Sequence, residues 1–301
     1  MAESAFRCGY IGLVGRPNVG KSTLLNRMVG QKISITSRKP QTTRHRILGI
    51  HTTDSAQMIF VDTPGLHRAE KNRMNRYMNR AALTTIQDVD LILFMIDAGK
   101  WTAEDETVLD YLRHSERPVI LIINKVDRSK DKSLLLPFIS EVSGKYEFVE
   151  VIPISARKGD NLDTLEAAVT RMLPVSPPIY DPDQVTDRSM RFIAAESIRE
   201  KLMRGLGQEL PYQLTVEIER YREEKGRIHI NAVVWVEREN QKGIVIGRQG
   251  SRLKEAGTQA RKELENITGK KVNLELWVKV RSGWLDDERS LRSLGYADDE
   301  F

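Results

Sequence analysis

The chain has 301 residues and a net charge of +5, with 47 basic and 42 acidic side chains and 40% hydrophobic residues. This length exceeds the roughly 100–200 residues of one typical domain, and the composition is too apolar for a disordered chain, so we expect two folded domains. The longest apolar runs are far shorter than the roughly 20 residues of a membrane-spanning helix, and a single cysteine, Cys8, excludes an internal disulfide.

From residue 10 to about residue 173, short runs of branched apolar residues alternate with stretches of helical period. This pattern is typical of βαβ units around a mostly parallel sheet with helices on both faces. The expected strands are residues 10–14, 58–61, 91–96, 119–123 and 149–154. Each of them ends where a polar motif begins. Because ligands lie beyond the carboxyl ends of the strands in such sheets, we expect the motifs to converge on one site.

The first expected strand is followed by the sequence GRPNVGKS, which matches the phosphate-binding pattern G-x-x-x-x-G-K-[ST] and opens an expected helix. The backbone N–H groups of such a loop face inward and surround a β-phosphate. Lys21 would add a positive charge over the β- and γ-phosphates, and Ser22 would bind Mg²⁺. The predicted phosphate-binding residues of this segment are Gly15, Arg16, Pro17, Asn18, Val19, Gly20, Lys21, Ser22 and Thr23.

The second expected strand ends at the sequence DTPG. Asp62 would hold the metal ion through water, and Gly65 would donate its N–H to the γ-phosphate. Asp97 ends the third expected strand and is a second candidate metal ligand. It lacks the D-x-x-G turn that would contact phosphate, so Asp62 is the preferred ligand.

The sequence NKVD follows the fourth expected strand. The Asp127 carboxylate can accept from the ring N–H and the exocyclic amine of guanine, two donors that adenine lacks. A site built on such buried hydrogen bonds rejects the wrong analogue by roughly 10⁴–10⁵-fold. Asn124 would brace the surrounding loops, and the stem of Lys125 would lie along the base. Ser155 and Ala156, after the fifth expected strand, would offer a backbone N–H to the guanine carbonyl.

Residues 174–187 hold four prolines and little apolar periodicity, which is typical of an extended linker. We therefore expect a first domain at residues 1–173 and a second at residues 188–301, which includes a C-terminal tail. The expected elements of the second domain are a helix at 188–203, strands at 212–221 and 227–237, a short helix, a longer helix at 251–267 and a strand at 271–280.

A G-x-x-G loop lies between the two later helices. Two glycines would let the loop press its backbone against phosphates, and the apolar residues behind it would receive splayed bases, as in a KH module that clamps about four nucleotides. Residues 242–281 carry ten basic and four acidic side chains, which favours a polyanionic partner. The predicted RNA-binding residues are Ile244, Val245, Ile246, Gly247, Arg248, Gln249, Gly250, Arg252 and Lys254.

The nucleotide motifs in this order resemble those of the translation-factor class of P-loop GTPases. Together with the G-x-x-G module they resemble, over nearly the whole chain, the Era family of bacterial ribosome-assembly GTPases. The resemblance implies an α/β P-loop GTPase domain followed by an α+β type II KH domain, with GTP as substrate and GDP as product.

The resemblance also implies two switch segments. In the first, a threonine completes the Mg²⁺ shell; Thr43 is preferred because it directly precedes an arginine, and Thr42 is the alternative. The predicted switch residues are Gln41, Thr42, Thr43, Asp62, Thr63, Pro64, Gly65 and Leu66.

Leu66 stands where many GTPases carry the glutamine that orients the attacking water. A leucine cannot polarise water. The chain resembles GTPases in which the P-loop asparagine, here Asn18, helps to hold a potassium ion that supplies positive charge, so K⁺ at Asn18 is a hypothesis. His67 as general base is a rival, although a solvent-facing loop residue is the simpler interpretation.

By resemblance the partners are the 3′ end of 16S ribosomal RNA and the 30S subunit, whose assembly the protein would serve. No secretory signal precedes the first strand, which favours the cytoplasm. The alternative is a membrane-associated signalling or cell-cycle GTPase whose basic segment meets anionic lipid, and the resemblance also allows peripheral contact with the inner membrane. The G-x-x-G loop favours RNA, because lipid binding needs no such loop. Trp235, Trp277 and Trp284 could stack on bases, but their positions favour the core.

Overall fold

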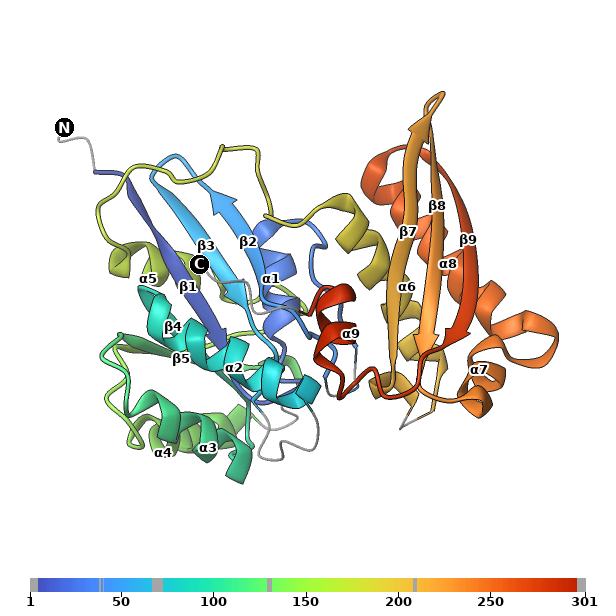
Figure 1. Cartoon of the computed structure of the whole chain (residues 1–301). Helices are drawn as coiled ribbons and strands as arrows, with labels where there is room; N and C mark the ends of the chain where they lie inside the picture. Colours follow the sequence, from blue (N-terminus) through green and yellow to red (C-terminus); the bar gives the residue numbers. More distant parts are fainter. Residues whose placement is uncertain are drawn as a thin grey trace. The chain divides into compact units, whose positions relative to one another are not determined.

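The structure is a computed structural model that describes residues 5–37, 39, 41–66, 73–128, 132–207 and 210–296. The chain divides into two compact units. One is made mainly of residues up to Asp187 and the other mainly of residues from Arg188 onward. Each unit is described by itself (Figure 1).

A six-stranded sheet forms the centre of the first unit, in the order β2-β3-β1-β4-β5-β6. Its strands are β1 (Arg7–Val14), β2 (Ile47–Thr52), β3 (Ala56–Asp62), β4 (Leu91–Asp97), β5 (Val119–Asn124) and β6 (Glu150–Pro153). β2 runs antiparallel to β3, and all other neighbours are parallel. This confirms the mostly parallel sheet, and it brings the carboxyl ends of β1, β3, β4 and β5 to one edge.

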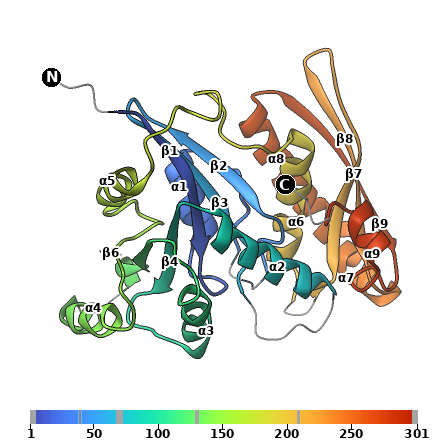
Figure 2. The ribbon, with the colours of Figure 1, turned by 60° about the vertical axis from the view of Figure 1, so that its left-hand side comes forward.

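Helices cover both faces of this sheet (Figures 1 and 2). They are α1 (Lys21–Val29), α2 (Arg73–Asp88), α3 (Ala103–Leu112), α4 (Leu135–Ser143) and α5 (Leu162–Met172), with short 3₁₀ turns η1 (Val126–Arg128) and η2 (Lys132–Leu134). Buried residues of α2, α3 and α4, among them Ile86, Leu109 and Val142, share one apolar core with β4 and β5. α1 packs on the other face, where an added Cβ on Gly49 of β2 would lie 2.4 Å from the Leu25 side chain.

Residues 174–187 have no helix or strand of their own, but they follow the first unit closely. Gln57 of β3 is fully buried, and its side chain accepts from the N–H groups of Ile179 and Tyr180 at 2.8 and 2.9 Å and donates to the Tyr180 carbonyl at 2.8 Å. Further along, the N–H of Ile50 in β2 donates to the Val185 carbonyl at 2.9 Å. The segment expected to be a linker is therefore hydrogen-bonded to the first unit up to its end.

The second unit contains a three-stranded sheet in the order β7-β8-β9, with helices packed against it. Its elements are α6 (Met190–Gly205), η3 (Leu210–Tyr212), β7 (Leu214–Glu224), β8 (Arg227–Val236), α7 (Glu239–Ile246), η4 (Arg248–Gly250), α8 (Ser251–Thr268), β9 (Lys271–Val280) and α9 (Glu288–Ser293). β7 and β8 form the expected hairpin, and β9 joins β8 in parallel. Ile198 of α6 and Ala260 of α8 lie in the core under this sheet.

The three tryptophans of this unit differ in their surroundings. Trp284 is fully buried, as expected for a core residue, whereas 42% of Trp277 is exposed, so its assignment to the core was wrong. The Trp235 indole N–H donates to Glu217 at 2.7 Å, and the Lys279 ammonium lies 5.7 Å from the centre of its ring. A position in or next to an expected strand did not predict whether each ring would be buried or exposed, because helices cover only one face of this sheet.

Cys8 lies in the core of the first unit, where 2% of its surface is exposed. Burial raises the pKa of its thiol, which suits a small core residue rather than a nucleophile. Among the helices that the structure describes, none has the length and apolar content needed to cross a membrane.

Candidate nucleotide site and RNA interface

The segment between β1 and α1 is a curled loop that depends on two glycines. An added Cβ would lie 2.5 Å from the Met95 carbonyl oxygen at Gly15 and 2.3 Å from the Asn124 amide nitrogen at Gly20. Both glycines also have positive φ angles, of 151° and 112°. A side chain at either position would strain the backbone and displace a neighbouring strand end.

Lys21 is folded back into this loop. Its ammonium donates to the carbonyls of Gly15 at 2.8 Å and Arg16 at 3.2 Å, and 6% of the residue is exposed. Burial lowers its pKa to about 8, although the nearby Asp62 acts in the opposite direction. The ammonium is thus already held over the space that the loop encloses.

A cluster of oxygen atoms gathers at the end of β3. The Asp62 carboxylate is fully buried and accepts from the hydroxyls of Ser22 at 2.7 Å and Ser34 at 2.8 Å. The Thr43 hydroxyl lies 2.9 Å from that of Ser22. The Thr42 hydroxyl instead donates to the Lys39 carbonyl at 2.6 Å. Between the two threonines left open by the sequence, the geometry favours Thr43.

This cluster suits Mg²⁺, which prefers oxygen ligands and is usually held by one or two carboxylates together with substrate phosphates. The second oxygen of Asp62 is buried without a hydrogen-bond partner among the described residues. Burial raises the pKa of the Asp62 carboxyl, because it disfavours the ionised form. A bound cation would offset the free-energy cost of keeping this carboxylate ionised. Within the described parts of the chain, no three His, Cys, Asp or Glu side chains gather as a metal site of another kind.

Asn124, the last residue of β5, ties three loops together. Its amide donates to the Val19 carbonyl at 2.7 Å, and its carbonyl oxygen accepts from the N–H groups of Lys125 at 2.8 Å and Ala156 at 3.0 Å. Asp127 accepts from the Ser155 hydroxyl at 2.8 Å and stays partly exposed. The residues predicted to recognise guanine are therefore adjacent to one another and to the phosphate-binding loop.

The side chain of Arg16 does not point into the curled loop. Its guanidinium lies 2.9 Å from the Asp97 carboxylate and 3.2 Å from that of Asp105. Burial alone would disfavour the charged form, but Asp105 and Asp97 raise the pKa of Arg16, so it remains charged. Only the backbone of Arg16 is available to a phosphate, and Asp97 is engaged with cations rather than with the oxygen cluster.

The second switch segment begins against the curled loop. An added Cβ on Gly65 would lie 2.9 Å from the Pro17 nitrogen, and the Thr63 hydroxyl donates to the Leu13 carbonyl at 2.9 Å. Leu66 is 7% exposed and belongs to the apolar core. Its side chain thus contributes packing rather than water activation. His67, considered as a rival base, lies outside the described residues.

The G-x-x-G loop of the second unit has a backbone that requires glycine. Gly247 has φ 75° and ψ 175°, a region that is essentially open to glycine alone, and its Cβ would lie 2.8 Å from the Arg252 side chain. Gly250 has φ 75° and open space around it. Arg248, Gln249, Arg252 and Lys254 are exposed, Ile246 is partly buried, Ile244 is 42% exposed, and Val245 is in the core.

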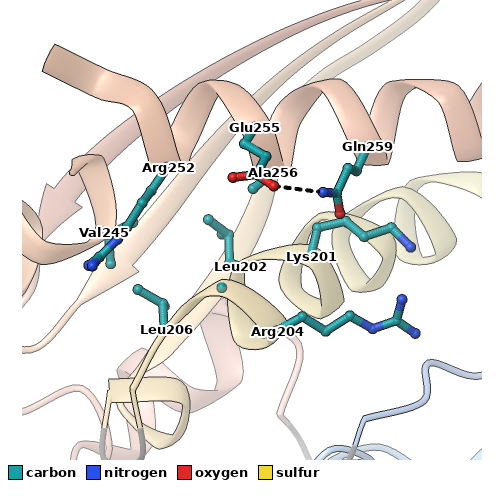
Figure 3. A pocket seen from close by; sticks show the side chains of 10 residues that line it. Lys201, Leu202, Arg204, Leu206, Val245, Arg252, Glu255, Ala256 and Gln259 are labelled. Carbon is teal, nitrogen blue, oxygen red and sulfur yellow. Dashed lines mark hydrogen bonds between the residues drawn. The ribbon is translucent and has the colours of Figure 1, made fainter. Parts of the chain in front are cut away.

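A hollow of about 270 Å³ lies between α6, α7 and α8, beside this loop (Figure 3). Leu202, Leu206, Val245 and Ala256 form its apolar part, and charged or polar side chains from α6 and α8 surround it. Arg252 belongs to that rim and donates to the Ile244 carbonyl at 3.1 Å, so it links the two helices that flank the loop. Figure 3 also shows Glu255 accepting from Gln259.

Two residues of the nucleotide site were not predicted: Ser34 joins the oxygen cluster, and Asp105 holds Arg16. Asp97, the second candidate metal ligand, also pairs with Arg16. The only sequence signal was at Asp105, where Thr102 and Asp105 form a capping box that marks the start of α3. That signal predicts a helix but says nothing about an ion pair with the phosphate-binding loop.

The curled loop before α1, the oxygen cluster after β3 and the Asn124 loop after β5 define a P-loop GTPase, and the elements from α6 to β9 define a KH module. Residues 10–125 match the family model described as a 50S ribosome-binding GTPase, and residues 209–285 match the KH domain. The chain belongs to the Era family of GTPases. It is 58% identical over 300 residues to the GTPase Era of Histophilus somni strain 129Pt, covering 99% of this chain and 100% of that protein.

Other relatives agree in length and fold. The GTPase Era of Ectopseudomonas mendocina strain ymp is 54% identical over 292 residues, which cover 97% of this chain and 98% of that one. A crystal structure of Era with MgGDPNP and nucleotides 1506–1542 of 16S ribosomal RNA matches with a TM-score of 0.94 and 42% identity, over 97% of this chain and 99% of that one. A point variant of Aquifex aeolicus Era bound to GDP·AlF₄⁻ also matches with a TM-score of 0.94 and 42% identity, over 97% of this chain and 100% of that one.

Proposed function

We propose that this GTPase is a nucleotide-controlled switch that binds the 3′ end of 16S ribosomal RNA and acts in the assembly of the 30S subunit. The observation that carries the proposal is the backbone of Gly247, whose conformation and close approach to Arg252 leave no room for a side chain in an exposed loop. A relative that is 42% identical to this chain was crystallised with a segment of that RNA and a GTP analogue.

In this proposal the curled loop holds the phosphates of GTP or GDP through its backbone N–H groups, with Lys21 over the β- and γ-phosphates. Ser22, Thr43 and Asp62 hold Mg²⁺, which neutralises charge on those phosphates. Asp127 accepts from the guanine ring, and the Ala156 N–H, which donates to the Asn124 side chain in this structure, would turn to the guanine carbonyl when the nucleotide binds. The support is that all these groups lie at one edge of the sheet, linked by the hydrogen bonds of Asn124.

Leu66 cannot orient or polarise the attacking water as a glutamine would, and we infer that K⁺ held at Asn18 assists hydrolysis by supplying positive charge. Asn18 lies inside the curled loop, where it has a positive φ of 65°. GTP turnover is expected to be faster in KCl than in NaCl at the same ionic strength. Equal rates in the two salts, with equal GTP binding, would count against the potassium hypothesis.

The RNA assignment is tested by fluorescence anisotropy with a labelled oligonucleotide from the 3′ end of 16S ribosomal RNA. The intact chain is compared with a Gly247→Asp, Gly250→Asp variant, each in GDP and in a non-hydrolysable GTP analogue. We expect tighter binding with the analogue, and a loss of roughly 100-fold or more in the variant, because two acidic side chains repel the RNA backbone and strain the loop.

Gly226→Asp is the matched control. Gly226 lies in the turn between β7 and β8 with φ 73° and no atom within 4 Å of an added Cβ. It therefore receives one acidic side chain, against two in the loop variant, at a positive φ away from the loop, and RNA affinity is expected to stay within about twofold of wild type. Binding that ignores both nucleotide and loop glycines would overturn the proposal and favour the membrane-associated alternative, which binding to anionic vesicles would then support.

We place the protein in the cytoplasm on this proposal, since its RNA partner is there. Peripheral contact with the inner membrane is a further proposal, which the family resemblance allows and which the basic residues 242–281 would serve. Co-sedimentation with vesicles of anionic lipid at physiological salt separates the two, because RNA binding without vesicle binding would remove the membrane from the proposal.

A further inference from the structure

Asp97 connects two loops of the nucleotide site through its two carboxylate oxygens. It is the last residue of β4 and pairs in register with Asn124 at the end of β5. One oxygen lies 2.9 Å from the guanidinium of Arg16 in the phosphate-binding loop. The other lies 2.7 Å from the ammonium of Lys125 in the guanine-binding loop. A single carboxylate thus bridges the two loops that would hold opposite ends of a nucleotide.

Arg16 and Lys125 each make a further contact besides the one with Asp97. The Lys125 ammonium donates to the Asn18 carbonyl at 2.6 Å, which joins the guanine-binding loop to the phosphate-binding loop a second time. The guanidinium of Arg16 also meets Asp105, and that carboxylate accepts from the backbone and hydroxyl of Thr102 at the start of α3. The chain of contacts therefore runs from α3 through Arg16 and Asp97 to Lys125.

These contacts are largely shielded from water. About 10% of the Arg16 side chain and 20% of those of Asp97 and Lys125 are exposed. Charges in such a place are screened less than surface pairs. Without the carboxylate, two cations would face each other across the end of β4, so each would move its loop away from the other.

We propose that Asp97 is a positioning residue that couples the phosphate-binding loop to the guanine-binding loop, so that both ends of the nucleotide meet one preassembled site. The proposal rests on the assignment of these loops to guanine nucleotide. It gives the Arg16 side chain a role that does not require contact with phosphate. Asp97 does not read the base itself, because Asp127 is the group that faces it.

The test is the dissociation rate of a fluorescent (mant) GDP, measured by displacement with excess GDP. Asp97→Asn is expected to accelerate dissociation on the order of 10- to 100-fold, the range for losing a hydrogen-bonded charge pair. Arg16→Gln is expected to accelerate it in the same direction. The double variant should exceed the larger single effect by roughly threefold at most, because both changes break one connection.

Three further readouts separate positioning from other roles. Asp97→Asn should weaken GDP and IDP by the same factor, since IDP lacks only the amine that Asp127 would bind. The nucleotide-free variant should melt in one cooperative transition at a lower temperature, and excess GDP should raise its melting temperature by less than that of wild type. Asp110→Asn, on the exposed side of α3 where Asp110 pairs with Arg113, should leave dissociation unchanged.

The proposal is overturned if Asp97→Asn dissociates GDP at the wild-type rate, binds GDP more tightly because a negative charge is gone, or shows effects that add to those of Arg16→Gln. If Asp97→Asn does not fold, Arg16→Gln decides alone, since wild-type dissociation in that variant also overturns the coupling. A wild-type chain that fails to retain GDP would instead contradict the assignment of the nucleotide site.

Discussion

At Lys21 the protein buries a charged side chain inside the loop that would bind phosphate. Burial lowers the pKa of this ammonium to about 8, so near that pH half of the nucleotide-free molecules carry a neutral Lys21. A bound phosphate favours the charged form and raises the pKa. In the free protein the unfolded chain binds more protons than the folded one between about pH 8 and 10.5, so the free energy of unfolding rises with pH in that window.

The binding of GDP is therefore expected to take up about half a proton at pH 8 and distinctly less at pH 7. Above pH 8 the affinity should fall by up to about tenfold per pH unit, since an increasing share of the free protein must be protonated first. Titration calorimetry with Mg-GDP in two buffers of different ionisation enthalpy measures the uptake directly. Clear binding at pH 8 with no proton uptake would show that Lys21 is already fully charged in the free protein.

Single residues were predictable where their chemistry fixes both residue type and position. Lys21, Asp62 and Asp127 follow from motifs, because phosphate, metal and guanine each demand a particular group at a strand end. The partners of Arg16 were not predictable in this way. Asp97 and Asp105 lie about 80 and 90 residues further along the chain, and an ion pair across that separation leaves no pattern in spacing.

Among the elements, the extended segment at residues 174–187 depends on one buried amide. Gln57→Leu keeps the volume of the side chain roughly constant but leaves the backbone N–H groups of Ile179 and Tyr180 and the Tyr180 carbonyl without their partner. A fully buried group left unpaired costs about 1–3 kcal/mol, and the cost is smaller for the Ile179 amide because that residue is 53% exposed. We expect the free energy of unfolding, measured in urea, to fall by about 2 kcal/mol or more.

Hydrogen exchange gives this prediction a local readout, because the amides of Ile179 and Tyr180 should lose protection first. Gln87→Leu is the matched control, since Gln87 is exposed on α2 and the same substitution there should change stability by less than about 0.5 kcal/mol. A loss of stability equal in the two variants would show that the hydrogen bonds of Gln57 contribute little.

The sequence predicted best those elements whose apolar residues recur with a clear helix or strand period. The strands that end in motifs and the β7–β8 hairpin were found, whereas β2 was missed. The sequence of β2, ILGIHT, carries a glycine and ends in a short turn rather than in a polar motif. Its glycine is explained only by the helix behind it, because Gly49 leaves room for Leu25. Packing between distant segments therefore determined a strand that the local sequence did not predict.

For the molecule as a whole, the boundary between the two compact units falls at Asp187 and Arg188. The proline-rich composition of residues 174–187 predicted a segment without helix or strand but gave no sign that the first unit would hold it. The hydrogen bonds that hold it come from Gln57 and β2, which are more than 120 residues away. A linker is predicted from the absence of apolar periodicity. That absence carries no information about the residues that the segment contacts.

The segment at residues 174–187, which runs beside β2, affects the tendency of the protein to aggregate in a crowded solution. β2 is the outer strand of its sheet, and an uncovered outer strand offers a row of unpaired groups to any other chain. Val185 and Thr186 occupy part of that row through Ile50 and Leu48. The opposite outer strand, β6, is four residues long and ends in Pro153, which cannot donate. Both margins of the sheet are thus protected against aggregation by addition of a foreign strand.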